Sequence, residues 1–194
     1  MLTLAQMTTI VADNVTADVA DIPARHFNTA QVDISRYTKR RKTSTVAAAD
    51  GVFTLPSVCL ILKAVAWAGK ALEPYGGDIL PTIPTGTPRY YMQLDNTIYL
   101  IPKLGGNASI VFVPRPADLV QAADTSELKD AEDALIALAT QKWYEEDPDS
   151  EEEAVWWKQL ADERITAWVE LDSQRHYQRA KVRSKAMSSY MGRW

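Results

Sequence analysis

Apolar side chains recur every three to four positions along residues 3–42, the spacing that places them on one face of a helix. Two helices are predicted here. In the first, Thr3 and Gln6 stand at capping-box spacing, so each side chain can satisfy a free backbone amide in the first turn. The apolar face of this helix is formed by Leu4, Met7, Val11 and Val15.

Pro23 interrupts the pattern, and the second helix is predicted after it. Asn28 and Gln31 repeat the spacing of a cap. The apolar stripe of this helix is formed by Ala30, Ile34 and Tyr37. The helix is expected to close on the four cations of residues 39–42, because positive charge suits the C-terminal end of the helix dipole.

Residues 43–116 have strand character, with eight of the ten prolines and short apolar runs separated by turn signals. Asp50-Gly51, the stretch 68–70 and Asp95-Asn96 each lie between two such runs, where tight hairpin turns are expected. The predicted strands are 45–49, 52–55, 59–67, 71–73, 90–94, 97–101 and 109–113. We expect these strands to form an antiparallel meander.

Helical spacing returns at residues 124–172. Asp124 and Glu127 can cap a helix that carries Leu128 and Leu135 on its apolar face, and the sequence Asp147-Pro148-Asp149 breaks it. Ser150 and Glu153 form the capping box of a last helix, with three acids in its favourable first turn. The buried stripe of that helix is predicted to be Trp157, Ala161, Ile165, Trp168 and Leu171.

Together these patterns indicate an α+β fold. We expect a helical bundle of N- and C-terminal helices with an inserted antiparallel β-meander and an extended or helical basic C-terminal tail. One domain is predicted over residues 1–172, with helices in 3–42 and 124–172 and the β insertion at 43–116. Residues 173–194 are expected to form the tail.

Charge separates the tail from the rest of the chain more clearly than the net charge of −4 suggests. Residues 124–172 contain 16 acidic side chains and four basic ones. Residues 173–194 contain six basic side chains and no acidic one. Such polarity indicates that the tail has a task of its own.

Few residues are suited to catalysis or metal binding. Cys59 is the single cysteine and lies in an apolar run, where a small buried hydrophobic residue is expected. His26 and His176 lack the spacing of a zinc site, and both are expected at a surface or an interface. The sequence has no phosphate-binding loop and no hydrolase motif, and the acidic run 145–153 lacks the glycine of a calcium loop. We therefore expect a protein that is not an enzyme and has no cofactor or metal.

Membrane contact is not expected either. No apolar run reaches the ~18 to 20 residues of a membrane span, and the first residues lack the basic start and apolar core of a signal peptide. The composition, with 46% apolar and 24% charged residues, is that of a soluble globular protein.

The basic tail also carries aromatic and sulfur-containing side chains at helical spacing. Such side chains anchor a short segment in a partner's pocket, with Arg and Lys at the rim, whereas leaving them in water exposes apolar area. A disordered basic tail is the alternative. The predicted docking residues are Arg175, Arg179, Lys181, Arg183, Lys185, Met187, Tyr190, Met191, Arg193 and Trp194.

A nucleic-acid-binding module is the main alternative function. It would use the cations of residues 39–42 together with the tail, because clustered cations release counterions when they bind phosphates. Against it, the tryptophans at 156, 157 and 168 lie on an acidic helix, which repels a nucleic-acid backbone. A tail-tube or head-completion subunit of a virus is a further alternative, and a small hydrolase is the weakest.

Three segments carry short motifs. The first spans 51–56 and 63–72, where a strand ends in Leu-Pro and the next strand leads into a small-residue turn. The second joins Pro88-Arg89-Tyr90-Tyr91 to the strand and proline of 95–102, and the third is the strand and exit of 110–119. In these motifs, and in its order of helices, sheet insertion and helices, the chain resembles the head-to-tail adaptor proteins of short-tailed phages.

This resemblance covers roughly residues 3–171 and implies a structural virion protein of the neck, assembled in the host cytoplasm. Its partners would be the portal protein, the next tail component (a tail tube or nozzle) and further copies of itself in a ring, usually a dodecamer. DNA would pass through the ring without sequence-specific binding. The C-terminal segment would dock on the portal, and the acidic helix pair would face the channel or a neighbouring subunit.

Overall fold

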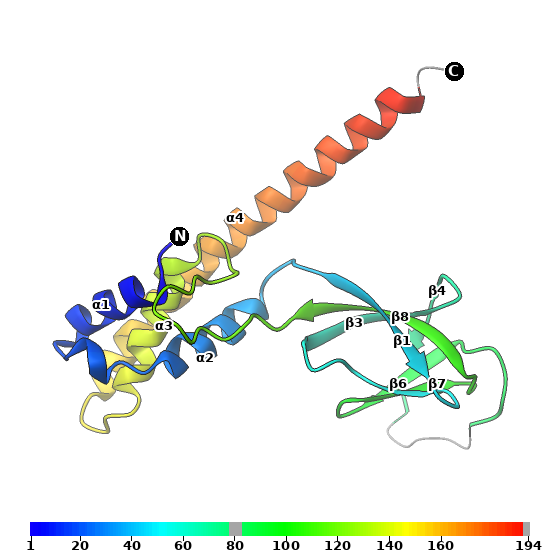
Figure 1. The fold of residues 1–194 in the computed structure, drawn as a ribbon, viewed down its shortest axis with the longest axis horizontal. Coiled ribbons are helices and arrows are strands. Elements are labelled where there is room, and N and C mark those ends of the chain that lie inside the picture. The colour runs from blue at the N-terminus through cyan, green and yellow to red at the C-terminus, as the bar shows by residue number, and fades with distance from the viewer. Residues whose placement is uncertain (78–82, 192–194) are drawn as a thin grey trace. The chain divides into compact units, whose positions relative to one another are not determined.

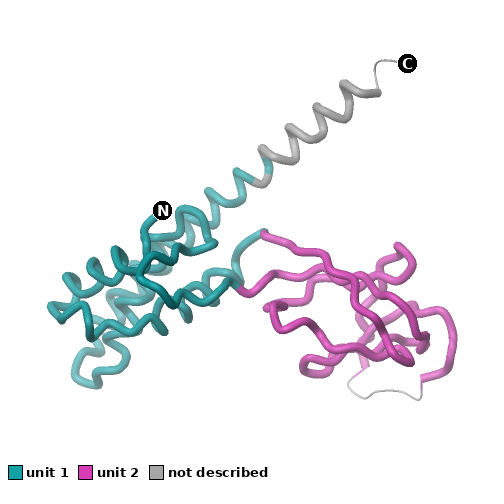
Figure 2. Tube along the Cα trace, viewed as in Figure 1, with its two compact units in different colours: residues 1–39, 116–194 teal, residues 40–115 magenta. Residues whose placement is uncertain are grey.

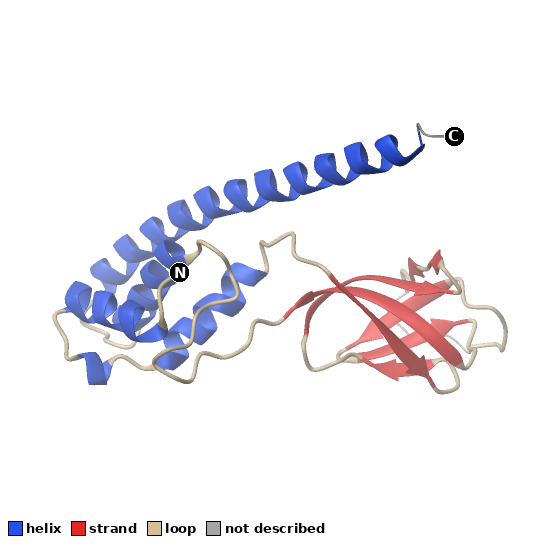
Figure 3. Cartoon of the chain, turned by 45° about the horizontal axis from the view of Figure 1, so that its top comes forward, coloured by secondary structure: helices blue, strands red, loops and turns tan. Residues whose placement is uncertain are grey.

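The computed structural model describes the backbone of residues 1–77 and 83–191, and the side chains of all of these except 176 and 178–191. The chain divides into two compact units (Figures 1 and 2). Unit 1 combines Met1–Lys39 with Pro116–Trp194 and is helical, whereas unit 2, Arg40–Arg115, is built from strands (Figure 3). The predicted α+β composition with antiparallel sheets is confirmed.

Helix α3 lies at the centre of unit 1. The helices of this unit are α1 (Leu4–Val15), the short 3-10 helix η1 (Val19–Asp21), α2 (Ala24–Ser35), α3 (Glu132–Tyr144) and α4 (Glu151–Met191). Helix α3 packs against α1, α2 and α4, and its residues 134–141 are all buried. Because it is apolar around its whole circumference, it serves as the core on which the other three helices pack.

The start of α1 follows the sequence prediction. Thr3 is the N-cap, its hydroxyl accepts from the Gln6 amide at 3.3 Å, and the Gln6 side chain accepts from the Thr3 amide at 2.9 Å. Leu4, Met7 and Val11 are buried as expected. The capping box and the apolar stripe therefore specify this helix locally.

Helix α2 starts earlier and ends earlier than its pattern predicted. Pro23 is its N-cap, so the proline begins the helix, and Asn28 lies inside it rather than at its start. The helix ends at Ser35, and Lys42 is already the first residue of a strand. The prediction of helix up to residue 42 was wrong, and Tyr37, expected in the apolar stripe, is 59% exposed.

The start predicted for α3 was also wrong. The helix begins at Glu132, and residues 124–131 form a loop. The Asp124 carboxylate accepts the amides of Val120 and Gln121, both at 2.8 Å, and so closes a turn that precedes it. These hydrogen bonds to the charged form hold the pKa of Asp124 below its ordinary value.

Helix α4 begins after Ser150, as predicted, although the Ser150 hydroxyl donates to Asp147. Ala161, Ile165 and Trp168 are buried, whereas Leu171 is 40% exposed and does not belong to the stripe. The backbone stays helical to Met191, a run of 41 residues that spans about 60 Å at 1.5 Å per residue.

Unit 2 contains two four-stranded sheets. Their strand orders are β1-β8-β3-β4 and β2-β7-β6-β5, so β1 pairs with β8 and β2 with β7. Only β5 and β6 pair in parallel among the described strands. The strands are β1 (Lys42–Ala48), β2 (Val52–Thr54), β3 (Cys59–Trp67), β4 (Lys70–Ala71), β5 (Glu73–Pro74), β6 (Tyr90–Leu94), β7 (Thr97–Ile101) and β8 (Gly106–Pro114).

The predicted sequential meander is therefore wrong, because the chain crosses between two sheets. Apolar side chains from both sheets form one core, which includes Phe53, Val65, Ile98, Leu100 and Phe112. Long-range pairing of β1 with β8 depends on this shared burial, a non-local property that turn signals do not encode.

The three predicted turns are confirmed. Asp50-Gly51 joins Ala49 to Val52, residues 68–69 join β3 to β4, and Asp95-Asn96 joins β6 to β7. The first residue of each turn has φ near +50°, the left-handed conformation that such tight hairpins require.

Candidate assembly surface

Two contacts fix α4 to the loop that precedes α3. The indole Nε1 of Trp168 donates to the carbonyl of Lys129 at 2.9 Å, and the Trp168 ring is 5% exposed. The guanidinium of Arg175 forms an ion pair with Asp130. Arg175, the first of the predicted docking residues, is thus held within its own unit.

A third contact joins α4 to the segment after α2. The carboxylate of Asp172 accepts from the Thr38 hydroxyl at 3.3 Å and from the Lys39 amide at 3.2 Å. Because the carboxylate meets a backbone amide as well as a hydroxyl, it positions the chain leaving α2. The acidic residue at 172 therefore has an internal structural role.

The other predicted docking residues lie beyond these contacts. Tyr177, one helical half-turn after Arg175, is the last described side chain and is 71% exposed. The backbone at 179, 181, 183, 185, 187, 190 and 191 is helical, but those side chains lie outside the description, as do residues 193 and 194 and the His176 side chain. Docking by the tail remains a prediction.

The first two turns of α4 expose an aromatic side chain among carboxylates. Trp156 and Val155 are each 56% exposed, and Trp156 packs edge-on against the half-buried Trp157, with ring centroids 4.9 Å apart. Glu152 and Glu153 precede Trp156 by four and three residues and are exposed. At these spacings the three side chains share one face of the helix.

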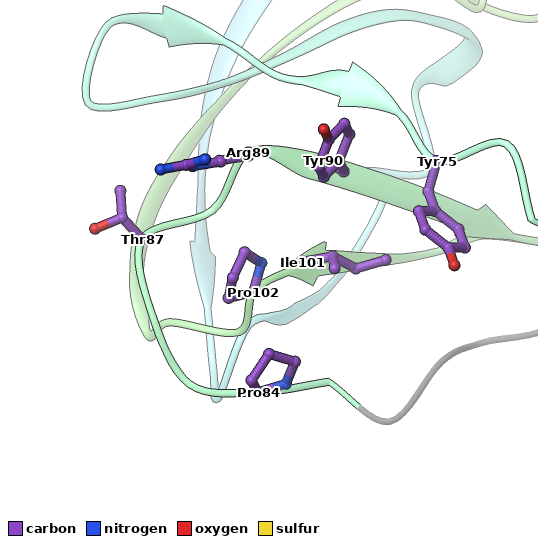
Figure 4. A pocket seen from close by; sticks show the side chains of 7 residues that line it. All are labelled: Tyr75, Pro84, Thr87, Arg89, Tyr90, Ile101 and Pro102. Carbon is purple, nitrogen blue, oxygen red and sulfur yellow. The ribbon is translucent and has the colours of Figure 1, made fainter.

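Unit 2 has an open hollow of about 600 Å³ at one end of the β6–β7 hairpin (Figure 4). Arg89 and Tyr90 come from the start of β6, Tyr75 follows β5, and Ile101 and Pro102 close the end of β7. The rings of Tyr75 and Tyr90 meet edge to face with centroids 6.5 Å apart. The hollow thus combines two tyrosine rings, apolar side chains and one guanidinium.

His26 is buried, at 3% exposure, where the sequence predicted a surface or interface position. Its ring meets Trp143 edge to face, and Nε2 lies 3.8 Å from Glu146, which Arg25 holds with two bonds of 2.8 Å. Burial lowers the pKa of His26, and the charge of Glu146 partly opposes the shift. The cluster is thus a buried imidazole beside an exposed ion pair.

The comparison with protein families identifies the family of this chain. The model of the SU10 adaptor protein family matches residues 2–184, which includes both units and most of α4. The chain belongs to this family. The SU10 adaptor protein is a phage head-to-tail adaptor, a structural component of the virion neck that interacts with portal and tail components. No curated protein matches the chain.

The single thiol of this chain lies in unit 2. Cys59 is half-buried against the core of unit 2, and burial raises the pKa of its thiol, which disfavours the nucleophilic thiolate. Among the described residues, no group of three His, Cys, Asp or Glu side chains is placed to hold a metal ion. None of the described helices is long and apolar enough to cross a membrane.

The cations of residues 39–42 do not close a helix in this adaptor. They follow α2, cross from unit 1 to unit 2 and end at the first residue of β1. The Arg41 guanidinium donates to the Arg40 carbonyl at 2.8 Å. Sequence reasoning found the tail and this cluster from charge alone, but it missed the hollow, whose residues come from three separate segments.

Proposed function

We propose that this member of the SU10 adaptor family forms a closed ring beneath the portal, extends the DNA channel and offers a platform to the next tail component. Twelve copies are expected, to match the ring that the resemblance implies. DNA would pass through without sequence-specific contacts. The C-terminal part of α4 would dock on the portal through the cationic and aromatic residues of 179–194, whereas Arg175, also predicted to dock, pairs with Asp130 in its own unit.

The observation that carries the proposal is the family match, because it continues to residue 184 and so includes four of the six cations of residues 173–194. A cationic segment that belongs to the family pattern is suited to a partner. The five cations of residues 176–194, and the lack of acids there, favour an acidic docking surface.

Helix α4 supports the proposal mechanically. Trp168 and Arg175 attach it to the loop before α3, and Asp172 attaches it to the chain after α2. From this attachment the backbone remains one helix to Met191. A docking segment continuous with an anchored helix loses less conformational entropy on binding than a flexible peptide does.

The alternative of a nucleic-acid-binding module, expected from the cations of 39–42, gains no support from the family match. The acidic character of residues 124–172 disfavours it, since 16 carboxylates repel phosphates. A salt-dependent shift of duplex DNA by the isolated protein would favour this candidate over the ring.

The test is co-sedimentation with portal rings. If residues 178–194 serve a partner and not their own chain, deleting them should leave the melting temperature unchanged. We expect it to lose portal binding. A variant with Arg179, Lys181, Arg183 and Lys185 all changed to Gln keeps the length of the helix, and it should bind at least about tenfold more weakly. Undiminished binding by the deletion variant would refute docking through the tail.

A further inference from the structure

Trp156 presents an aromatic knob on the surface of unit 1. Its ring is 56% exposed, an unusual cost for the largest side chain, and it is flanked on the same helix face by Glu152 and Glu153. Neither carboxylate has an ion-pair partner among the described residues. The face therefore offers one large ring and two uncompensated negative charges.

The hollow of unit 2 offers the opposite set of groups. Arg89 is exposed and has no ion pair with any residue that the structure describes. Tyr75 and Tyr90 stand on the same side of the hollow, with Pro102 and Ile101 opposite them (Figure 4). A volume of about 600 Å³ is ample for an indole ring. Aromatic walls and a guanidinium suit a tryptophan that is accompanied by a carboxylate.

We propose that the knob of one copy, Trp156 with Glu152 and Glu153, docks into the hollow of the neighbouring copy. Trp156 would pack between the tyrosine rings and Pro102, and Arg89 would pair with a glutamate. Three independent features agree: opposite charge, matching aromatic character and sufficient volume. In the pair, the exposed ring would be covered and the charged groups would gain ion-pair partners.

We take the occupant of the hollow to be a second copy, because this same chain carries the surface that complements it in charge and aromatic character. The contact joins two different surfaces, so each copy can engage one neighbour through its knob and another through its hollow. Head-to-tail contacts of this kind close into rings. The inference deepens the proposed ring and rests on it, since it names the surface through which copies meet.

A pair of engineered cysteines tests the contact directly. One chain carries Glu153→Cys and Arg89→Cys in a Cys59→Ser background. This variant protein is assembled on portal rings and then oxidised. We expect a ladder of covalent multimers longer than dimers, because each copy would be linked to one neighbour through position 153 and to another through position 89. Each single-cysteine variant alone should form no covalent dimer, which excludes like-to-like contacts. Mixing the two single-cysteine variants should stop the ladder at dimers. A double variant that assembles on the portal without any covalent ladder overturns the inference and leaves the proposed ring intact.

A reciprocal charge exchange is an independent test. Arg89→Glu and Glu153→Arg should each weaken copy-to-copy association on the portal at least about tenfold, and the double variant should restore it. The controls are Arg115→Glu in unit 2 and Glu170→Arg in unit 1, which make the same charge reversals at other exposed positions. Neither control should change the association. Equal losses in all four single variants would contradict a specific contact.

Two further outcomes separate the proposals. If the unmodified protein forms no ring on the portal, the proposed function fails and the inference fails with it. If rings form in every variant but Tyr90→Ala abolishes binding of the next tail component, the hollow receives that partner and the second copy is excluded. Tyr37→Ala, which removes another exposed tyrosine, is the control.

Discussion

Asn28 and Leu119 form two reciprocal hydrogen bonds across 91 residues of sequence. The side-chain oxygen of Asn28 accepts the Leu119 amide at 2.7 Å, and its side-chain nitrogen donates to the Leu119 carbonyl at 3.2 Å. The Asn28 side-chain amide thus makes the same two hydrogen bonds as a paired backbone residue in a sheet. These bonds connect helix α2 to the loop that follows unit 2 in the sequence. Further along the same loop, the Asp124 carboxylate accepts the Val120 and Gln121 amides at 2.8 Å, and the Asp124 carbonyl accepts the Leu4 amide at 2.7 Å.

Replacing this amide should destabilise unit 1. Asn28→Ala leaves a partly buried amide and carbonyl without partners, and we expect the free energy of unfolding to fall by about 1–3 kcal/mol. Asn28→Asp keeps the acceptor and loses the donor, so it should cost less. Urea unfolding measures both, with the exposed Asn14→Ala as control. Equal stability of Asn28→Ala and the control would contradict this role.

Two glycines with the same backbone conformation should respond differently to alanine. Gly51 and Gly69 have φ of +76° and +77°, but a Cβ on Gly51 would lie 2.7 Å from the Cβ of Lys103, whereas a Cβ on Gly69 would meet open space. Gly69→Ala should therefore cost only the left-handed strain, about 1–2 kcal/mol. Gly51→Ala should cost about 1–3 kcal/mol more. Thermal unfolding distinguishes them, and the reverse order would show that the steric account is wrong.

Replacing each of two tryptophans of α4 with alanine should have very different effects on stability. Trp168 is 5% exposed and its indole donates to Lys129, so Trp168→Ala should lower stability by about 3–5 kcal/mol. Trp156→Ala removes an exposed ring and should change stability by less than about 0.5 kcal/mol in the isolated protein. Chemical denaturation of the two variants measures the difference. A large loss in Trp156→Ala would mean that its ring supports the fold of its own chain.

His26 should make stability depend on pH. Burial holds the pKa of His26 below its ordinary value of 6.5, so the folded state resists a proton that the unfolded chain accepts. The stabilising contribution is complete above the unfolded pKa and is lost as pH falls below it. The free energy of unfolding should thus drop more between pH 7.5 and 5.5 in the natural protein than in His26→Phe. If the free energy of unfolding changes with pH in the same way in both proteins, His26 is not the cause of this pH dependence.

Local signals predicted local structure well. Thr3 with Gln6, Asp50-Gly51 and Asp95-Asn96 each satisfy backbone groups within a few residues, and all three behave as predicted. In these cases the partner of each polar group lies nearby in sequence. The conformational preferences of these residues and their local hydrogen bonds then favour the same structure, independently of contacts with the rest of the fold.

The same signals failed where the partner is distant. Asn28 has the spacing of a cap but bonds to Leu119, and Asp124 closes a turn instead of starting a helix. The pairing of β1 with β8, and the burial of His26 among charged neighbours, depend on packing between segments far apart in sequence. For the candidate surfaces, charge pattern indicated the tail, whereas the hollow of Arg89 and Tyr90 required the folded chain.

The central claim is that this adaptor works as a ring docked on the portal through the end of α4. Electron cryomicroscopy of the protein assembled on its portal tests it most directly. The account predicts a closed ring with residues 178–194 of every copy in contact with the portal. A ring or monomer in which that segment packs against its own chain, with no density linking it to the portal, would contradict it.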